Sequence, residues 1–236
     1  MREKIIEGNI YHVLSRGVDK RKIFNEDLDY LRFIHDLFEF NDINPINNVT
    51  YFFQNQSKDI ARPYIAFERR PRKLLVDLLA FALMPNHYHL LIRPRLEGSL
   101  TKFMKRLNMG YAKYFNEKNE RTGALFEGRF KSIAVSKEAH FIHLPYYIHL
   151  NPLDLCAPEW RDHKLKDYKK VNKFLSEYRW SSHLDYLGKN NFSSVTQREF
   201  LLEYFGGHEE YKKDFNNWLK NLDNLKNVEG VGLEPI

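Results

Sequence analysis

Two histidines separated by a single residue, His87 and His89, are the side chains of this sequence best suited to chemistry. The apolar run 78–84 is followed by a Pro-Asn turn, and the run 87–93 is its expected hairpin partner. Since side chains two positions apart lie on the same face of a strand, both imidazoles are expected to project together. Two neutral imidazoles at this spacing can bind one divalent cation. The alternative is a pair of half-exposed strand histidines without a ligand.

A tyrosine and an asparagine supply the second half of a candidate site. Tyr147 and Asn151 are four residues apart at the end of a helix expected over about 137–150, so they share one helical face. If this helix packs across the sheet, a phenol and an amide oxygen face the imidazoles, which would bring together a nucleophile, a third metal ligand and a Lewis acid. The alternatives are core packing of Tyr146 and Tyr147, and a helix stop at the Asn-Pro pair.

The hydrophobic pattern predicts the elements that must position these groups. Ser99 is expected to cap a helix with a long apolar stripe, and Ser136 to cap the helix that carries Tyr147, which Pro145 should kink. The order β-α-β-β-α-β-α fits an α+β fold, a ferredoxin-like antiparallel sheet sandwich with helices on one face. The other expected elements are strands at 9–16 and 132–135, a helix at about 26–40 and a hairpin at about 75–94.

Two domains are expected in the 236 residues. Residues 1–155 form the domain that carries the candidate site, with an Asn-rich insertion at about 41–63. Residues 156–236 are predicted to be a helical C-terminal extension with a flexible tail after about residue 222.

Positive charge is concentrated in the first of these domains. Residues 1–155 hold 24 Lys and Arg against 18 Asp and Glu, whereas residues 156–236 hold 13 of each, so the net charge of +6 lies beside the histidines. Such a surface attracts phosphate polyanions, and the 15% aromatic content favours single-stranded nucleic acid because bases stack on aromatic rings. The alternative is a merely solvated basic surface.

Cysteine usage and hydropathy indicate the compartment. The one cysteine, Cys156, excludes an internal disulfide, which fits a reducing cytoplasm. We find no signal-peptide pattern and no apolar run near the ~20 residues of a membrane span, so we expect a cytoplasmic protein without a membrane partner.

Four segments together resemble a known family. They are YHVLSRG at 11–17, MPNHYHLLIRP at 84–94, GALFEGRFKS at 123–132 and YYIHLNP at 146–152. In order and spacing they resemble the HUH single-tyrosine transposases, which act on single-stranded insertion sequences, and within them the REP-associated tyrosine transposase branch. The resemblance runs from about residue 9 to 155, with a weaker similarity at 178–182.

The resemblance implies a role for each candidate residue. His87 and His89 match the metal-binding histidines, Asn151 matches the polar ligand one helical turn after the nucleophile, and Tyr147 matches that nucleophile, with Tyr146 as the competing candidate. The implied activity is cleavage and rejoining of single-stranded DNA through a 5′-phosphotyrosine intermediate, with Mg²⁺ or Mn²⁺ as the cofactor.

The expected partner is single-stranded DNA that contains a hairpin, bound by a monomer or a homodimer. For Arg129, the strongest candidate DNA contact, the alternative is a surface ion pair with Glu127 or Glu138. The residues expected to contact phosphates are Arg16, Lys102, Arg106, Arg129 and Lys131.

Three other functions are compatible with parts of the sequence. A replication or mobilisation nickase would use the same chemistry, and strand transfer would distinguish it. A domesticated, non-catalytic DNA-binding protein would not need all four site residues. A zinc hydrolase built on His140 and His143 is disfavoured because no carboxylate motif accompanies them.

Overall fold

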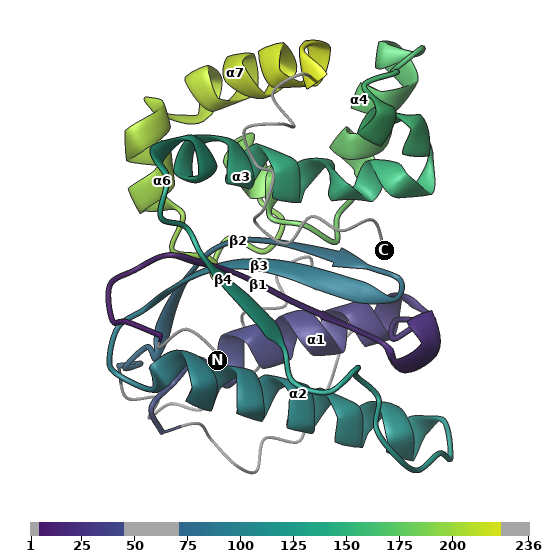
Figure 1. Ribbon diagram of the computed structural model, residues 1–236, viewed down its shortest axis with the longest axis vertical. Coiled ribbons are helices and arrows are strands. Elements are labelled where there is room, and N and C mark those ends of the chain that lie inside the picture. Colours follow the sequence, from purple (N-terminus) through teal and green to yellow (C-terminus); the bar gives the residue numbers. More distant parts are fainter. Residues whose placement is uncertain (1–4, 45–70, 223–236) are drawn as a thin grey trace.

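The computed structural model describes residues 5–44 and 71–222, and a four-stranded antiparallel sheet lies at its centre (Figure 1). The sheet and its first two helices comprise β1 Tyr11–Arg16, α1 Asp27–Glu39, β2 Val76–Met84, β3 His87–Pro94, α2 Ser99–Lys118 and β4 Lys131–Ala134. The spatial order β2-β3-β1-β4 and the chain order β-α-β-β-α-β are those of a ferredoxin-like fold, as predicted.

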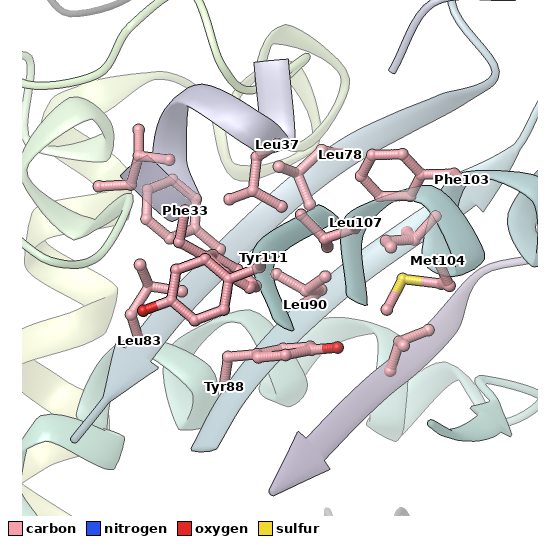
Figure 2. Close-up of a cluster of buried hydrophobic side chains, with 14 of the residues drawn as sticks. Phe33, Leu37, Leu78, Leu83, Tyr88, Leu90, Phe103, Met104, Leu107 and Tyr111 are labelled. Atoms are coloured by element: carbon pink, nitrogen blue, oxygen red, sulfur yellow. The ribbon is translucent and has the colours of Figure 1, made fainter. Parts of the chain in front are cut away.

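One face of the sheet is covered by α1 and α2, which form the first hydrophobic core with it (Figure 1). Tyr88 and Leu90 of β3 point into this core, so the alternation of the strand sends His87 and His89 to the opposite face. Figure 2 shows the packing of this core, with Phe33 and Leu37 from α1, Leu107 and Tyr111 from α2, and Tyr88 and Leu90 from β3.

The opposite face is covered by a second layer of helices (Figure 1). The prediction of helices on one face therefore holds for α1 and α2, and within the described residues helices also cover the other face. Both faces of β2 are buried along its whole length, which is why the sheet needs a cover on each side. The second layer comprises α3 Glu138–Leu150, α4 Tyr168–Glu177, α5 His183–Tyr186, α6 Glu199–Phe205 and α7 His208–Lys220.

The C-terminal extension is joined to the free edge of β2. The backbone N–H of Leu83 donates to the carbonyl of Trp180 at 2.9 Å, and that of Ser182 donates to the carbonyl of Phe81 at 3.0 Å. The second core also continues from α3 into α6 and α7. The predicted division after residue 155 remains a prediction, and this core spans it.

Local capping differs from the sequence prediction. Ser99 is the first residue of α2 and Gly98 is its N-cap, with a positive φ of 72°; the Ser99 hydroxyl donates to the carbonyl of Leu96 at 2.7 Å. Lys137, and not Ser136, is the N-cap of α3, which is a single helix across Pro145.

The expected insertion at 41–63, beyond residue 44, and the expected tail after 222 lie outside the described residues. Within the described residues, no helix is long and apolar enough to span a membrane.

Candidate active site

The two histidines of β3 are buried beneath the second layer of helices, His87 with 3% and His89 with 1% of its surface exposed. Their rings lie 5.0 Å apart, centre to centre, and are nearly perpendicular. Nδ1 of His87 hydrogen-bonds to Oδ1 of Asn86, in the hairpin turn, at 2.6 Å. Because an amide oxygen only accepts, this bond places the proton of His87 on Nδ1 and leaves a lone pair on Nε2.

A third histidine, His12 of β1, holds the ring of His89. Nε2 of His12 and Nδ1 of His89 share a hydrogen bond of 2.9 Å, and the two rings are stacked. His12 was not among the predicted site residues. The alternating pattern of residues 9–16 could have indicated it, because this pattern places His12 and Arg16 on the same face of the strand.

The remaining nitrogens of the histidine pair are the clearest sign of a ligand site. Among the described residues, Nε2 of His87 and Nε2 of His89 have no hydrogen-bond partner, although both atoms are buried. An unsatisfied buried polar group costs about 1–3 kcal/mol, and a bound ligand would remove that cost. Burial, with the nearby charges of Arg161 and Arg16, lowers the pKa of His87 to about 3. Both imidazoles are therefore neutral at pH 7, which is the form that binds metals.

Helix α3 presents Tyr147, and not Tyr146, to the histidines. The ring of Tyr147 lies 6.2 Å from that of His89, in an edge-on arrangement. The ring of Tyr146 lies against Phe205 and Tyr211 of the C-terminal extension instead. The two neighbouring tyrosines thus face different parts of the molecule.

Asn151 directly follows α3 and begins a 3₁₀ segment, Asn151–Leu155. It is fully buried and keeps a helical backbone, so its side chain stays one turn beyond Tyr147. Its Nδ2 donates to the carbonyl oxygen of Tyr147 at 2.8 Å, and this bond turns Oδ1 away from the helix. Tyr147 and Asn151 are therefore brought together as the sequence predicted.

Arg161, in a second 3₁₀ segment, Pro158–Asp162, connects these two side chains. Its Nη1 donates to the phenol oxygen of Tyr147 and its Nη2 to Oδ1 of Asn151, both at 3.0 Å. Burial raises the pKa of Tyr147, and the guanidinium opposes that shift. Sequence reasoning missed Arg161 because the segment around it has no periodicity or motif that distinguishes one arginine from another.

The predicted DNA contacts are divided between the two faces of the sheet. Arg16 ends β1 and pairs in register with His87, and it forms a salt bridge of 3.0 Å to Glu127. Lys131 lies opposite Leu14 of β1, on the same face as the histidines. These two cations lie near the candidate site.

The other three predicted contacts are less closely associated with the histidines. Arg129 is exposed, and Glu127, one of its two alternative ion-pair partners, is paired with Arg16 instead. Lys102 and Arg106 lie on α2, across the sheet; Arg106 donates to the carbonyl of Asp42 at 2.6 Å, whereas Lys102 is exposed.

The donors available to a metal ion are two imidazoles and one amide. Among the described residues, no group of three or more His, Cys, Asp and Glu side chains is placed to hold a metal ion. The chemistry of the two histidines suits a divalent cation, because both Nε2 atoms are buried without a hydrogen-bond partner among the described residues. His143, one half of the disfavoured zinc site, hydrogen-bonds instead to Nε1 of Trp218 at 2.9 Å.

Comparison with known proteins gives a family match and one similar solved structure. Residues 48–151 match the family model described as IS200-like transposase, a range that includes His87, His89, Tyr147 and Asn151. A solved REP-associated tyrosine transposase bound to a REP hairpin is similar with a TM-score of 0.46 and 11% sequence identity, over 83% of this chain and 88% of that one. No curated protein matches the chain.

Proposed function

We propose that this chain acts as an IS200-like transposase, the family whose model its residues 48–151 match, and that it cleaves and rejoins single-stranded DNA through a covalent bond to Tyr147. The observation that carries this proposal is the placement of Tyr147 edge-on to His89, with Arg161 on its phenol oxygen. Tyr146, which the sequence left as a competitor, packs into the C-terminal extension.

In the proposed reaction, the phenol oxygen of Tyr147 attacks a DNA phosphorus atom in line. The bond between phosphorus and the 3′ oxygen breaks, and the phenol proton ends on that oxygen. The products are a free 3′-hydroxyl and a 5′-phosphotyrosine. Because the covalent bond conserves the energy of the phosphodiester, a second 3′-hydroxyl can reverse the step and join two strands without ATP.

His87, His89 and Asn151 would hold Mg²⁺ or Mn²⁺ in this proposal. When bound, the ion supplies a Lewis acid for the charge that develops on the phosphate oxygens. The two partnerless Nε2 atoms support this assignment. An amide oxygen has two lone pairs, so Oδ1 of Asn151 can accept from Arg161 and still coordinate a cation.

The proposed substrate is single-stranded DNA with a hairpin. Arg16 and Lys131 lie on the histidine face of the sheet and supply positive charge beside the phosphorus that would react. Phosphate contacts of this kind position a strand without reading its sequence.

A denaturing gel tests the proposal. The purified protein is mixed with end-labelled single-stranded hairpin DNA, taken from the flanks of its own gene, and Mn²⁺ or Mg²⁺. We expect a covalent adduct that is absent in Tyr147→Phe and retained in the matched control Tyr146→Phe. Adding an acceptor strand with a free 3′-hydroxyl should yield a joined product, which a simple nickase would not form. DNA binding without an adduct, with either metal, would contradict the proposal and favour a non-catalytic DNA-binding protein.

A further inference from the structure

We propose that Arg161 is a catalytic residue of this site, which stabilises negative charge on the phenol oxygen of Tyr147 when the phenol loses its proton and when the covalent bond to DNA breaks. The inference rests on the proposed function, because it concerns the same oxygen. Because Arg161 lies in the C-terminal extension, the inference gives this extension a chemical role in addition to its packing against the sheet and α3.

The contacts of the guanidinium support this role. One N–H reaches the reacting oxygen of Tyr147 and another reaches Oδ1 of Asn151, each at 3.0 Å. Arg161 therefore holds the proposed nucleophile and a proposed metal ligand in one fixed arrangement.

The guanidinium is itself held by a carboxylate. Nε and Nη2 of Arg161 donate to the two oxygens of Asp154 at 2.8 and 2.7 Å. Nε1 of Trp160 also donates to Asp154, at 2.6 Å, and the arginine stacks over the Trp160 ring. Asp154 and Asn151 belong to the same 3₁₀ segment, so the arginine and the amide it contacts share one support.

Such a donor suits a phenol that reacts in both directions. The Tyr147 oxygen bears negative charge when it loses its proton to become the nucleophile, and again when it leaves as the strands rejoin. A hydrogen-bond donor fixed in advance at a site of developing charge typically accelerates a reaction by about 10²–10³-fold. Arginine stays protonated throughout, so its contribution does not depend on a proton transfer.

The experiment measures adduct formation and strand rejoining separately, in single-turnover reactions. The variants are Arg161→Ala, Arg161→Lys and a matched control, Arg179→Ala. Arg179 also lies in the extension and stacks on a tryptophan, with its guanidinium 4.9 Å from the Trp180 ring centre. Its other ring contact within the described part of the chain is with Phe192, away from the site residues. We expect Arg161→Ala to slow both steps by about 100-fold, with unchanged DNA affinity, and added guanidinium ion to restore part of the rate.

The outcomes separate this inference from the proposed function. Rates of Arg161→Ala within twofold of the Arg179→Ala control would overturn the role of Arg161 and leave the transposase chemistry intact. A wild-type protein that forms no adduct would overturn both. Arg161→Lys decides the matter if the alanine variant does not fold. Its single ammonium cannot reproduce the bonds to Tyr147, Asn151 and Asp154 together, so unchanged rates in this variant would contradict the inference.

Discussion

The orientation of His89 depends on one hydrogen bond from a neighbouring strand. His12 holds Nδ1 of His89, and Asn86 holds Nδ1 of His87, so each partnerless Nε2 is set in place by a second side chain. Outer partners of this kind fix the ring orientation of metal-binding histidines. The metal affinity of the proposed site should therefore depend on residues that would not touch the metal.

His12→Phe tests this dependence, because phenylalanine can keep the ring stack with His89 but cannot form the hydrogen bond. We expect Mn²⁺ to bind about 10–100-fold more weakly than to the wild-type protein, measured by isothermal titration calorimetry. His208→Gln, which alters a histidine of the C-terminal extension, serves as the control. Equal Mn²⁺ affinity in the His12 variant and the control would show that His12 does not orient the site.

Much of the site was predictable at this scale, and one part was not. The two-residue period of a strand places His87 and His89 together, and the four-residue spacing of a helix places Asn151 one turn after Tyr147. Arg161 follows neither period. It reaches Tyr147 only because a 3₁₀ segment and the half-buried carboxylate of Asp154 direct it there, and such tertiary contacts leave no local pattern.

Among the elements, β2 and α3 control how closely the tyrosine approaches the histidines. Ala82 of β2 pairs in register with His89 and is fully buried in the second core, together with Ala80 and Tyr147. Two small side chains on this strand leave room for the helix above it. The binary hydrophobic pattern predicted a buried strand here but carried no information on this separation.

Ala82→Leu should push α3 away from the sheet. We expect a loss of stability of about 1–3 kcal/mol from overpacking, measured by urea unfolding. Adduct formation should fall about tenfold or more, since small displacements of reacting groups are costly. Ala124→Leu, at an exposed position, is the control. An Ala82→Leu protein with wild-type stability and rate would indicate that the helix does not depend on this spacing.

For the molecule as a whole, a buried polar network connects the layers of the second core. The hydroxyl of Tyr211 in α7 hydrogen-bonds to Nδ1 of His149 at 2.6 Å and to Nδ1 of His183 at 3.2 Å. Nε2 of His149 bonds to the hydroxyl of Ser182, which also accepts from the backbone N–H of Phe81 in β2. The sheet, α3 and the C-terminal helices are thus held by one set of hydrogen bonds.

This network should make the global stability depend on pH. Burial lowers the pKa of His183 to about 3, so the unfolded chain binds a proton near pH 6.5 that the folded protein does not. The stability that depends on neutral His183 is therefore fully present above about pH 6.5 and is lost as the pH falls toward 3. At pH 5, protonation of His183 in the unfolded chain lowers the free energy of unfolding by about 2 kcal/mol.

His183→Asn removes this titration and is the informative variant. Its free energy of unfolding should be lower than that of the wild type at pH 7.5, but should fall less between pH 7.5 and pH 5. Denaturant unfolding at both pH values measures the difference. Identical losses in the two proteins would show that His183 does not contribute to the acid sensitivity.

The fold class followed from the sequence because each element has a clear period, and the order of elements allows few topologies. The second layer was harder to place. Its contacts with the sheet join residues about a hundred positions apart, as between Ala82 and Ser181, and nothing local in the sequence specifies such pairings.

The support of Arg161 also has a consequence for the order in which a growing chain acquires its parts. The histidines and the tyrosine leave the ribosome before Arg161, and the edge partner of β2 at Trp180–Ser182 follows later still. A chain released before residue 161 therefore carries the proposed nucleophile without the arginine that contacts it. In the proposed mechanism, efficient DNA cleavage would therefore require synthesis of the segment beyond residues 48–151, and truncated products would lack it.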